Sequence, residues 1–141
     1  MLKNNGHGWA LFTLEDFVGH PSYIDATPII LLDTFIEYYE NGHGVGVFDE
    51  EGSTFILVLA EYEANVIHRL DKNILYSMDS DVDDLAKEAY NDIAEHIEDW
   101  AKWDIFEDPD SDEWKKEYKE NMDLLNDRLR KLKTYIYKTE D

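Results

Sequence analysis

The stretch that decides the fold is GVGVF at residues 44–48, followed by the turn DEEG at 49–52 and the run TFILVLAEY at 54–62. Both runs are apolar and rich in β-branched and aromatic residues, which favour β-strands. Gly52 closes a short acidic loop between them, a pattern typical of a hairpin. We therefore predict an antiparallel β-hairpin over residues 44–62.

Similar short apolar runs lie on both sides of this hairpin. Residues 9–14 form one candidate strand, and residues 65–70 and 73–78 form two further short strands or one bent strand. With the hairpin, these segments predict an antiparallel sheet of four to six strands within residues 9–78.

The long apolar and aromatic stretch at residues 29–39 allows two interpretations. We favour a strand, because β-branched and aromatic residues are dense in it. Thr27-Pro28 before it and Asn41-Gly42 after it would also suit the start and the end of a helix. The strand is retained as the prediction, with the helix as its alternative.

After residue 79 the apolar residues recur at steps of three and four, the period of a helix with one buried face. The first predicted helix covers residues 80–103, with Ser80 as its N-cap residue. The second covers residues 111–137 and begins after Asp110, which has capping-box spacing to Glu113.

The order of these elements predicts an α+β fold, with an antiparallel sheet followed by two antiparallel C-terminal helices. The length of 141 residues supports one domain. Within it, residues 1–78 form a β-rich part and residues 79–141 a two-helix part.

The charge of the chain excludes several classes of partner. It has 33 Asp and Glu against 13 Lys and Arg, so its formal net charge is −20. Nucleic acids and anionic membrane surfaces repel such a charge, which disfavours direct binding to either. The apolar fraction of 43% is too high for a disordered acidic chain, so we expect a packed core.

The composition also bears on cellular location. The absence of cysteine excludes disulfides, thiolate metal sites and thiol catalysis, and it fits a reducing cytoplasm. No apolar run has the length of a signal peptide core or a membrane span. We therefore expect a cytoplasmic protein.

Motifs for catalysis and metal binding are incomplete. Two acidic runs, at residues 79–83 and 108–112, begin like the calcium loop of an EF-hand but lack its central Gly and its final Glu. Both lie where helices begin, and Asp and Ser are common there as caps. No HExxH motif occurs, and no serine lies in a nucleophile motif. We predict no cofactor, no metal and no catalytic residue.

The most specific feature is a row of six acids along the first predicted helix. At 100° per residue they fall within a sector of about 80°, beside the apolar face. Neighbouring carboxylates lie roughly 5–6 Å apart along the axis, a spacing that resembles that of phosphates in one nucleic-acid strand. The row predicts either a surface for a basic partner or a solvated face that keeps the protein soluble. The six residues, named here the acid row, are Asp81, Asp84, Glu88, Asp92, Glu95 and Asp99.

Aromatic residues follow the acid row. Trp100 and Trp114 lie on the apolar lines of the two predicted helices and are expected in the core. Trp103 and Phe106 lie off those lines, so they are either exposed anchors within an acidic rim or part of a loop packed on the sheet.

These features predict a small, acidic, non-catalytic protein that binds and inhibits a basic macromolecular partner. Toxins, nucleases and other nucleic-acid-binding enzymes fit as partners, so an immunity protein, an antitoxin or a phage-type inhibitor using nucleic-acid mimicry would have this character. One alternative is a metal-dependent or hydrolytic enzyme that uses His96 with Asp92 and Asp99. Another is a structural or regulatory subunit whose acidic surface only aids solubility.

Overall fold

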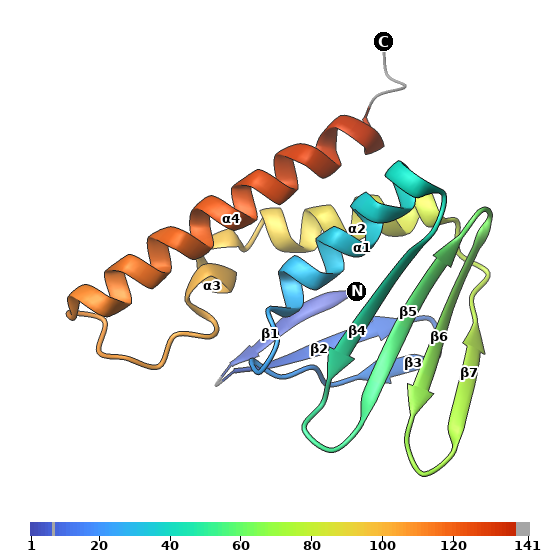
Figure 1. The fold of residues 1–141 in the computed structure, drawn as a ribbon, viewed down its shortest axis with the longest axis horizontal. Helices are drawn as coiled ribbons and strands as arrows, with labels where there is room; N and C mark the ends of the chain where they lie inside the picture. The colour runs from blue at the N-terminus through green and yellow to red at the C-terminus, as the bar shows by residue number, and fades with distance from the viewer. Residues whose placement is uncertain (7, 138–141) are drawn as a thin grey trace.

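The computed structural model describes residues 1–6 and 8–137 and has the predicted α+β architecture. Seven strands and four helices follow one another along the described chain (Figure 1). In order they are β1 Leu2–Gly6, β2 Trp9–Leu14, β3 Phe17–Gly19, α1 Thr27–Asn41, β4 Gly44–Asp49, β5 Thr54–Ala60, β6 Glu63–Arg69, β7 Asn73–Ser77, α2 Val82–Ala94, α3 Ile97–Lys102 and α4 Asp112–Ile136.

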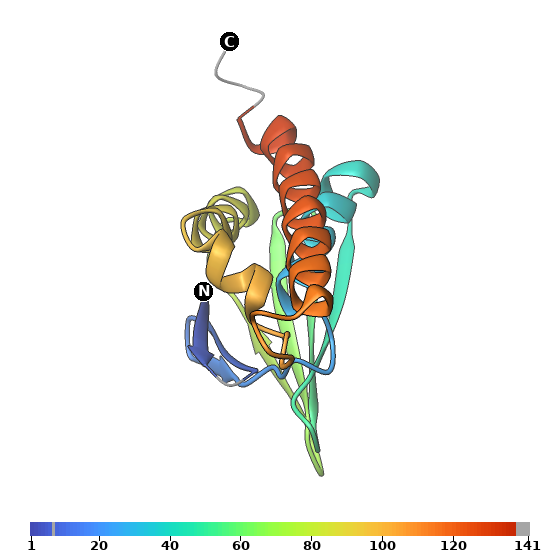
Figure 2. The same cartoon turned by 90° about the vertical axis from the view of Figure 1, so that its left-hand side faces the viewer.

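The strands form two antiparallel sheets, where one was expected. The predicted hairpin is confirmed as β4 and β5, which open a four-stranded sheet of order β4-β5-β6-β7. The segment predicted at 9–14 is β2, and it pairs with β1 and β3 in a separate three-stranded sheet. In Figure 2 this smaller sheet and the helices α2 and α3 lie together on one side of the four-stranded sheet.

The favoured strand at residues 29–39 is wrong, because this segment forms α1. Pro28 stands in its first turn, and Gly42 ends it in a left-handed conformation with φ 83°. The helix packs on β4 and β5 and also contacts α2 and α4. The helical period is present in its sequence, because Asp33, Glu37 and Glu40 recur at steps of four and three. The strand is favoured only by the β-branched and aromatic residues, which are dense around these acids.

The single helix predicted at 80–103 is divided in two. α2 ends at Ala94, and His96, with φ −127° and ψ 32°, leaves the helical conformation before α3 begins. The caps also differ from the prediction, because Asp81 accepts from the Asp83 N–H and Ser111 accepts from the Trp114 N–H. α4 matches the second predicted helix within one residue at each end.

One side chain joins three of the helices. The Tyr39 hydroxyl of α1 donates to Asp83 Oδ1 of α2 at 2.5 Å, and its ring stacks on Tyr135 of α4. Burial and the Asp83 carboxylate raise the pKa of Tyr39, so the hydroxyl keeps its proton and remains a donor. None of the helices in the described part of the chain has the length and apolarity that crossing a membrane requires.

We predict that Gly44→Ala destabilises the fold by about 3 kcal/mol. A Cβ at Gly44 would overlap the carbonyl oxygen of Thr34, so α1 would have to move away from β4. Urea unfolding measures the change. Val45→Ala is the control, because Val45 points outward and is 48% exposed, and an equal loss in both variants would contradict the close approach.

Candidate functional site

The structure divides the acid row between two helices and the residues that flank the first of them. Asp84, Glu88 and Asp92 lie on α2, and Asp99 lies on α3. Asp81 and Glu95 are the residues that flank α2 at its two ends. The chain leaves the helical conformation at His96, after Glu95, so the break separates Asp99 from the rest of the row. The predicted spacing is kept by Asp84, Glu88, Asp92 and Glu95.

Three members of the acid row have structural partners. Asp92 accepts the backbone N–H of Leu2 at 3.0 Å, and both Asp92 and Glu88 lie within 3.1 Å of the Met1 ammonium. Asp81 accepts the Asp83 N–H as the N-cap of α2. These contacts tie β1 to α2, a role that the sequence pattern did not indicate.

The other members are exposed. Among the described residues, the carboxylates of Asp84 and Glu95 take part in no ion pair or hydrogen bond, and Asp99 is 55% exposed and lies 3.6 Å from Lys102 Nζ. Asp84, Glu95 and Asp99 therefore remain available to a partner, and we name them the free acids.

The two candidate aromatic anchors have different environments. Trp103 is only 6% exposed and its Nε1 donates to the Trp9 carbonyl oxygen at 3.0 Å, so the expectation of an exposed anchor is wrong for it. The alternative, packing of this segment on the sheet, is correct. Phe106 is 59% exposed, as an anchor would be.

Phe106 belongs to an exposed apolar patch that the sequence did not indicate. Its ring lies edge to face on Tyr23 at 4.7 Å, and Tyr23 and Ile24 are 42% and 53% exposed. Gly8, with φ 79°, lets both rings approach the backbone, because a Cβ there would lie 2.8 Å from each. We name Phe106, Tyr23 and Ile24 the aromatic patch.

A shallow hollow connects Phe106 of the aromatic patch with Asp99, one of the free acids. It has a volume of about 270 Å³, and its lining includes Asp99, Lys102 and Phe106. The loop after Phe106 adds Glu107 and Asp108, both exposed. Phe106 is therefore bordered by the acids Asp99, Glu107 and Asp108, with the base Lys102 among them.

The residues of the enzyme alternative share a different hollow. His96, Asp92 and Asp99 line a space of about 500 Å³ between β1, β2 and the two helices. However, the residues that the structure describes contain no group of three His, Asp or Glu side chains placed to hold a metal ion. The two acidic runs that begin like an EF-hand loop lie at helix starts, as expected, with Asp81 and Ser111 as the caps.

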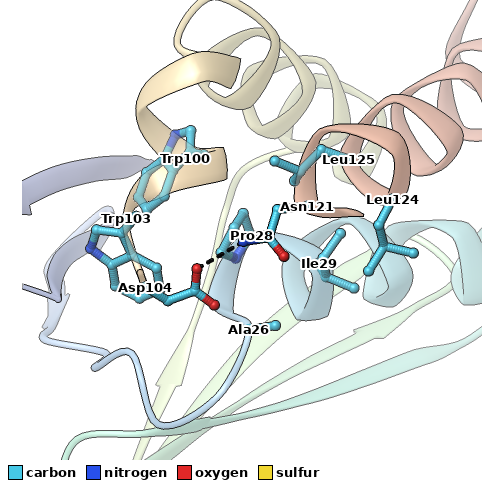
Figure 3. Close-up of a pocket in the computed structure, with 9 residues that line it drawn as sticks. All are labelled: Ala26, Pro28, Ile29, Trp100, Trp103, Asp104, Asn121, Leu124 and Leu125. Atoms are coloured by element: carbon cyan, nitrogen blue, oxygen red, sulfur yellow. Dashed lines mark hydrogen bonds between the residues drawn. The ribbon is translucent and has the colours of Figure 1, made fainter. Parts of the chain in front are cut away.

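Figure 3 shows a smaller cavity between α1, α3 and α4, with Trp100, Pro28 and Leu125 in its walls. Its volume of about 30 Å³ suits one or two water molecules and no larger ligand. Asp104 lies beside it and accepts from Asn121 Nδ2 at 3.0 Å. Burial raises the pKa of Asp104, although this hydrogen bond opposes the shift, and the nearby Glu107 adds to it.

Comparison with known proteins finds no relative: no family model, no curated protein and no solved structure matches the chain. A function is therefore inferred from the geometry of this chain.

We predict that Trp103→Ala lowers the free energy of unfolding by about 3–5 kcal/mol, because it removes a buried ring and leaves the Trp9 carbonyl without its donor. Phe106→Ala costs under about 1 kcal/mol, because the ring is mostly exposed. Chemical denaturation of both variants measures the two changes in the free energy of unfolding. A larger loss for Phe106→Ala than for Trp103→Ala would contradict the burial of Trp103 and the exposure of Phe106.

We predict that Asp104→Asn stabilises the protein at pH 7 by less than about 1 kcal/mol. Since the folded pKa is raised, the folded state holds the proton at a pH where the unfolded chain has lost it. The wild-type protein therefore gains stability as the pH falls through the folded pKa, and the advantage of the variant shrinks towards pH 4.

Urea unfolding at both pH values measures this difference. The exposed Asp123→Asn is the matched control for the loss of one negative charge. If the extra stability of Asp104→Asn stays constant with pH, the raised pKa of Asp104 in the folded state is contradicted.

Proposed function

We propose that this chain is a non-catalytic acidic binding protein that neutralises a basic macromolecular partner. The observation that carries the proposal is the exposed Phe106 beside Asp99, with the other free acids farther along the same helical side. Phe106 supplies an exposed apolar anchor, and the hollow it lines also holds Asp99. An aromatic centre within a charged rim is the composition of a binding hot spot.

The two parts of the site would act at different stages of binding. Long-range attraction by the acids accelerates encounter with a basic surface and orients the partner. Burial of Phe106 and Tyr23 in a pocket of the partner slows dissociation. Tight inhibition needs both, because screened charge pairs at a rim contribute little to affinity.

The distribution of bases supports this placement of the site. On α4, Arg128 Nε lies 2.7 Å from Asp33 and Lys131 Nζ lies 3.2 Å from Glu40, so these bases neutralise acids of α1. The α2 and α3 side has few cations for its acids: Lys87 and Lys102 on the helices, and the Met1 ammonium and Lys3 beside them. The negative potential is therefore concentrated there.

The partner class follows from this chemistry. A basic cleft that normally binds nucleic acid, as in a nuclease toxin or another nucleic-acid-binding enzyme, would accept a row of carboxylates in place of phosphates. The break at His96 limits any mimicry of a regular strand to α2. An immunity, antitoxin or phage-type inhibitor role in the cytoplasm is consistent with this partner class.

We predict that reversing the free acids with Asp84→Lys, Glu95→Lys and Asp99→Lys abolishes capture of basic partners. Asp92 is left intact because it holds the Leu2 N–H. The immobilised protein is incubated with a lysate fraction that heparin retains, at about 50 mM salt, and eluted at about 500 mM salt. Phe106→Ala should keep the encounter but speed dissociation, which surface plasmon resonance measures on the captured protein.

The control carries the same change of charge elsewhere. Glu51→Lys, Glu61→Lys and Asp71→Lys lie at exposed hairpin turns of the four-stranded sheet. This variant should retain capture. If both triple variants lose capture equally, the change in net charge alone explains the effect. If the first triple variant still captures its partner, the free acids are not part of the binding site.

A further inference from the structure

The four-stranded sheet has one open face. Phe48, Phe55 and Leu57 point inward and are fully buried, so the alternate residues of each strand point outward. The register aligns Val47, Ile56, Ile67 and Leu75 in one row across all four strands, and Val45, Val58, Asn65 and Ser77 in the next. We name these eight residues the open face.

The composition of the open face is that of a buried surface. Antiparallel strands with one solvated face normally alternate apolar and polar residues. Here β5 reads Phe55-Ile56-Leu57-Val58-Leu59, apolar on both sides. None of the eight residues is charged, although 33% of the chain is, and Val45, Val47 and Leu75 are 48%, 49% and 64% exposed.

The two ends of β6 carry opposite charges on this same side. The outward-pointing residues of β6 are Glu63, Asn65, Ile67 and Arg69. The side chain of Asn65 donates from Nδ2 to Glu63 Oε1 at 3.0 Å. Arg69 lies six positions after Glu63, a distance of about 20 Å along the strand. Within residues 1–6 and 8–137, Arg69 takes part in no ion pair.

We propose that the open face binds a second copy of this chain in a two-fold symmetric sandwich. The axis runs across the strands, midway between Glu63 and Arg69, so each strand lies antiparallel over its own counterpart. Glu63 of each copy then faces Arg69 of the other, and the symmetry makes this pair twice. The apolar rows meet between them, at the spacing of about 10 Å of packed sheets.

The size of the face fits a weak dimer. Four strands about 4.8 Å apart and about 20 Å long cover about 400 Å² per copy, or about 800 Å² in the two copies together. This size belongs to weak, transient interfaces, so association in the micromolar range or weaker is expected.

A second copy fits better than a basic partner, for reasons of charge. The open face itself carries no charge for a basic surface to pair with, and Glu63 and Arg69 at its two ends complement a second copy of the chain. Asp49, outward on β4 in the same row as Arg69, already accepts the Glu51 N–H. α2 contacts α1, α4 and β1, so the acid row lies on the other side of the sheet. Repulsion between two such rows is screened beyond a Debye length of about 8 Å at physiological salt.

Sedimentation velocity at protein concentrations from about 1 µM to about 1 mM tests the proposal. We expect a concentration-dependent dimer. Glu63→Arg and Arg69→Glu should each weaken it about tenfold, because each places like charges together at both symmetric pairs, and the double variant should restore it. Circular dichroism confirms that each variant is folded.

The two single variants distinguish loss of the Glu63–Arg69 pair from a change in the net charge of the chain. Glu63→Arg makes the chain less negative and Arg69→Glu makes it more negative, so an effect of net charge alone would change the dimer in opposite directions. Ile67→Lys should give a monomer, and Asp84→Lys, on the far side, should leave the dimer unchanged. A wild-type monomer at all concentrations, or a dimer that survives Ile67→Lys, overturns the proposal.

Discussion

Four phenylalanine side chains join the two sheets, and the rest of the structure depends on their packing. Phe12 and Phe17 come from the small sheet, Phe48 and Phe55 from the large one, and none of them is exposed. Phe55 lies 4.7–5.1 Å from the other three rings, centroid to centroid. A Cβ at Gly19 would overlap Phe55, so the absence of a side chain there permits this contact. The cluster places the small sheet on one face of the large sheet and leaves the opposite face uncovered.

The same packing arranges the charges. Because the small sheet is held against the large one, β1 is available to contact α2, where Asp92 accepts the Leu2 N–H. α4 returns along the helices and brings Arg128 and Lys131 to the acids of α1. These two bases of α4 are thereby paired with acids of α1, inside the helical layer. The acids of α2 and α3 remain in excess, and this asymmetry underlies the proposed binding of a basic partner.

The two proposed surfaces lie on different sides of the molecule and use different physics. The free acids and the aromatic patch would combine long-range attraction with a small apolar anchor. The open face would rely on apolar burial, with one complementary charge pair at each end. A dimer formed through the open face would present two acidic sites pointing away from each other. Binding of a basic partner would then not compete with dimer formation.

The sequence by itself determined the α+β class, the hairpin of β4 and β5, and the position of α4, because local periodicity and turn residues report directly on strands and helices. It also determined that acids concentrate in residues 79–113. Only the tertiary structure decided between strand and helix at residues 29–39, since the β-branched and aromatic residues favour a strand while the spacing of Asp33, Glu37 and Glu40 suits a helix. Only the tertiary structure decided that Trp103 is buried while Phe106 is exposed beside Tyr23. A sequence pattern shows which side of an element avoids water, but the contact partner is set by packing between distant segments, and that packing decided which acids and aromatic residues stay accessible.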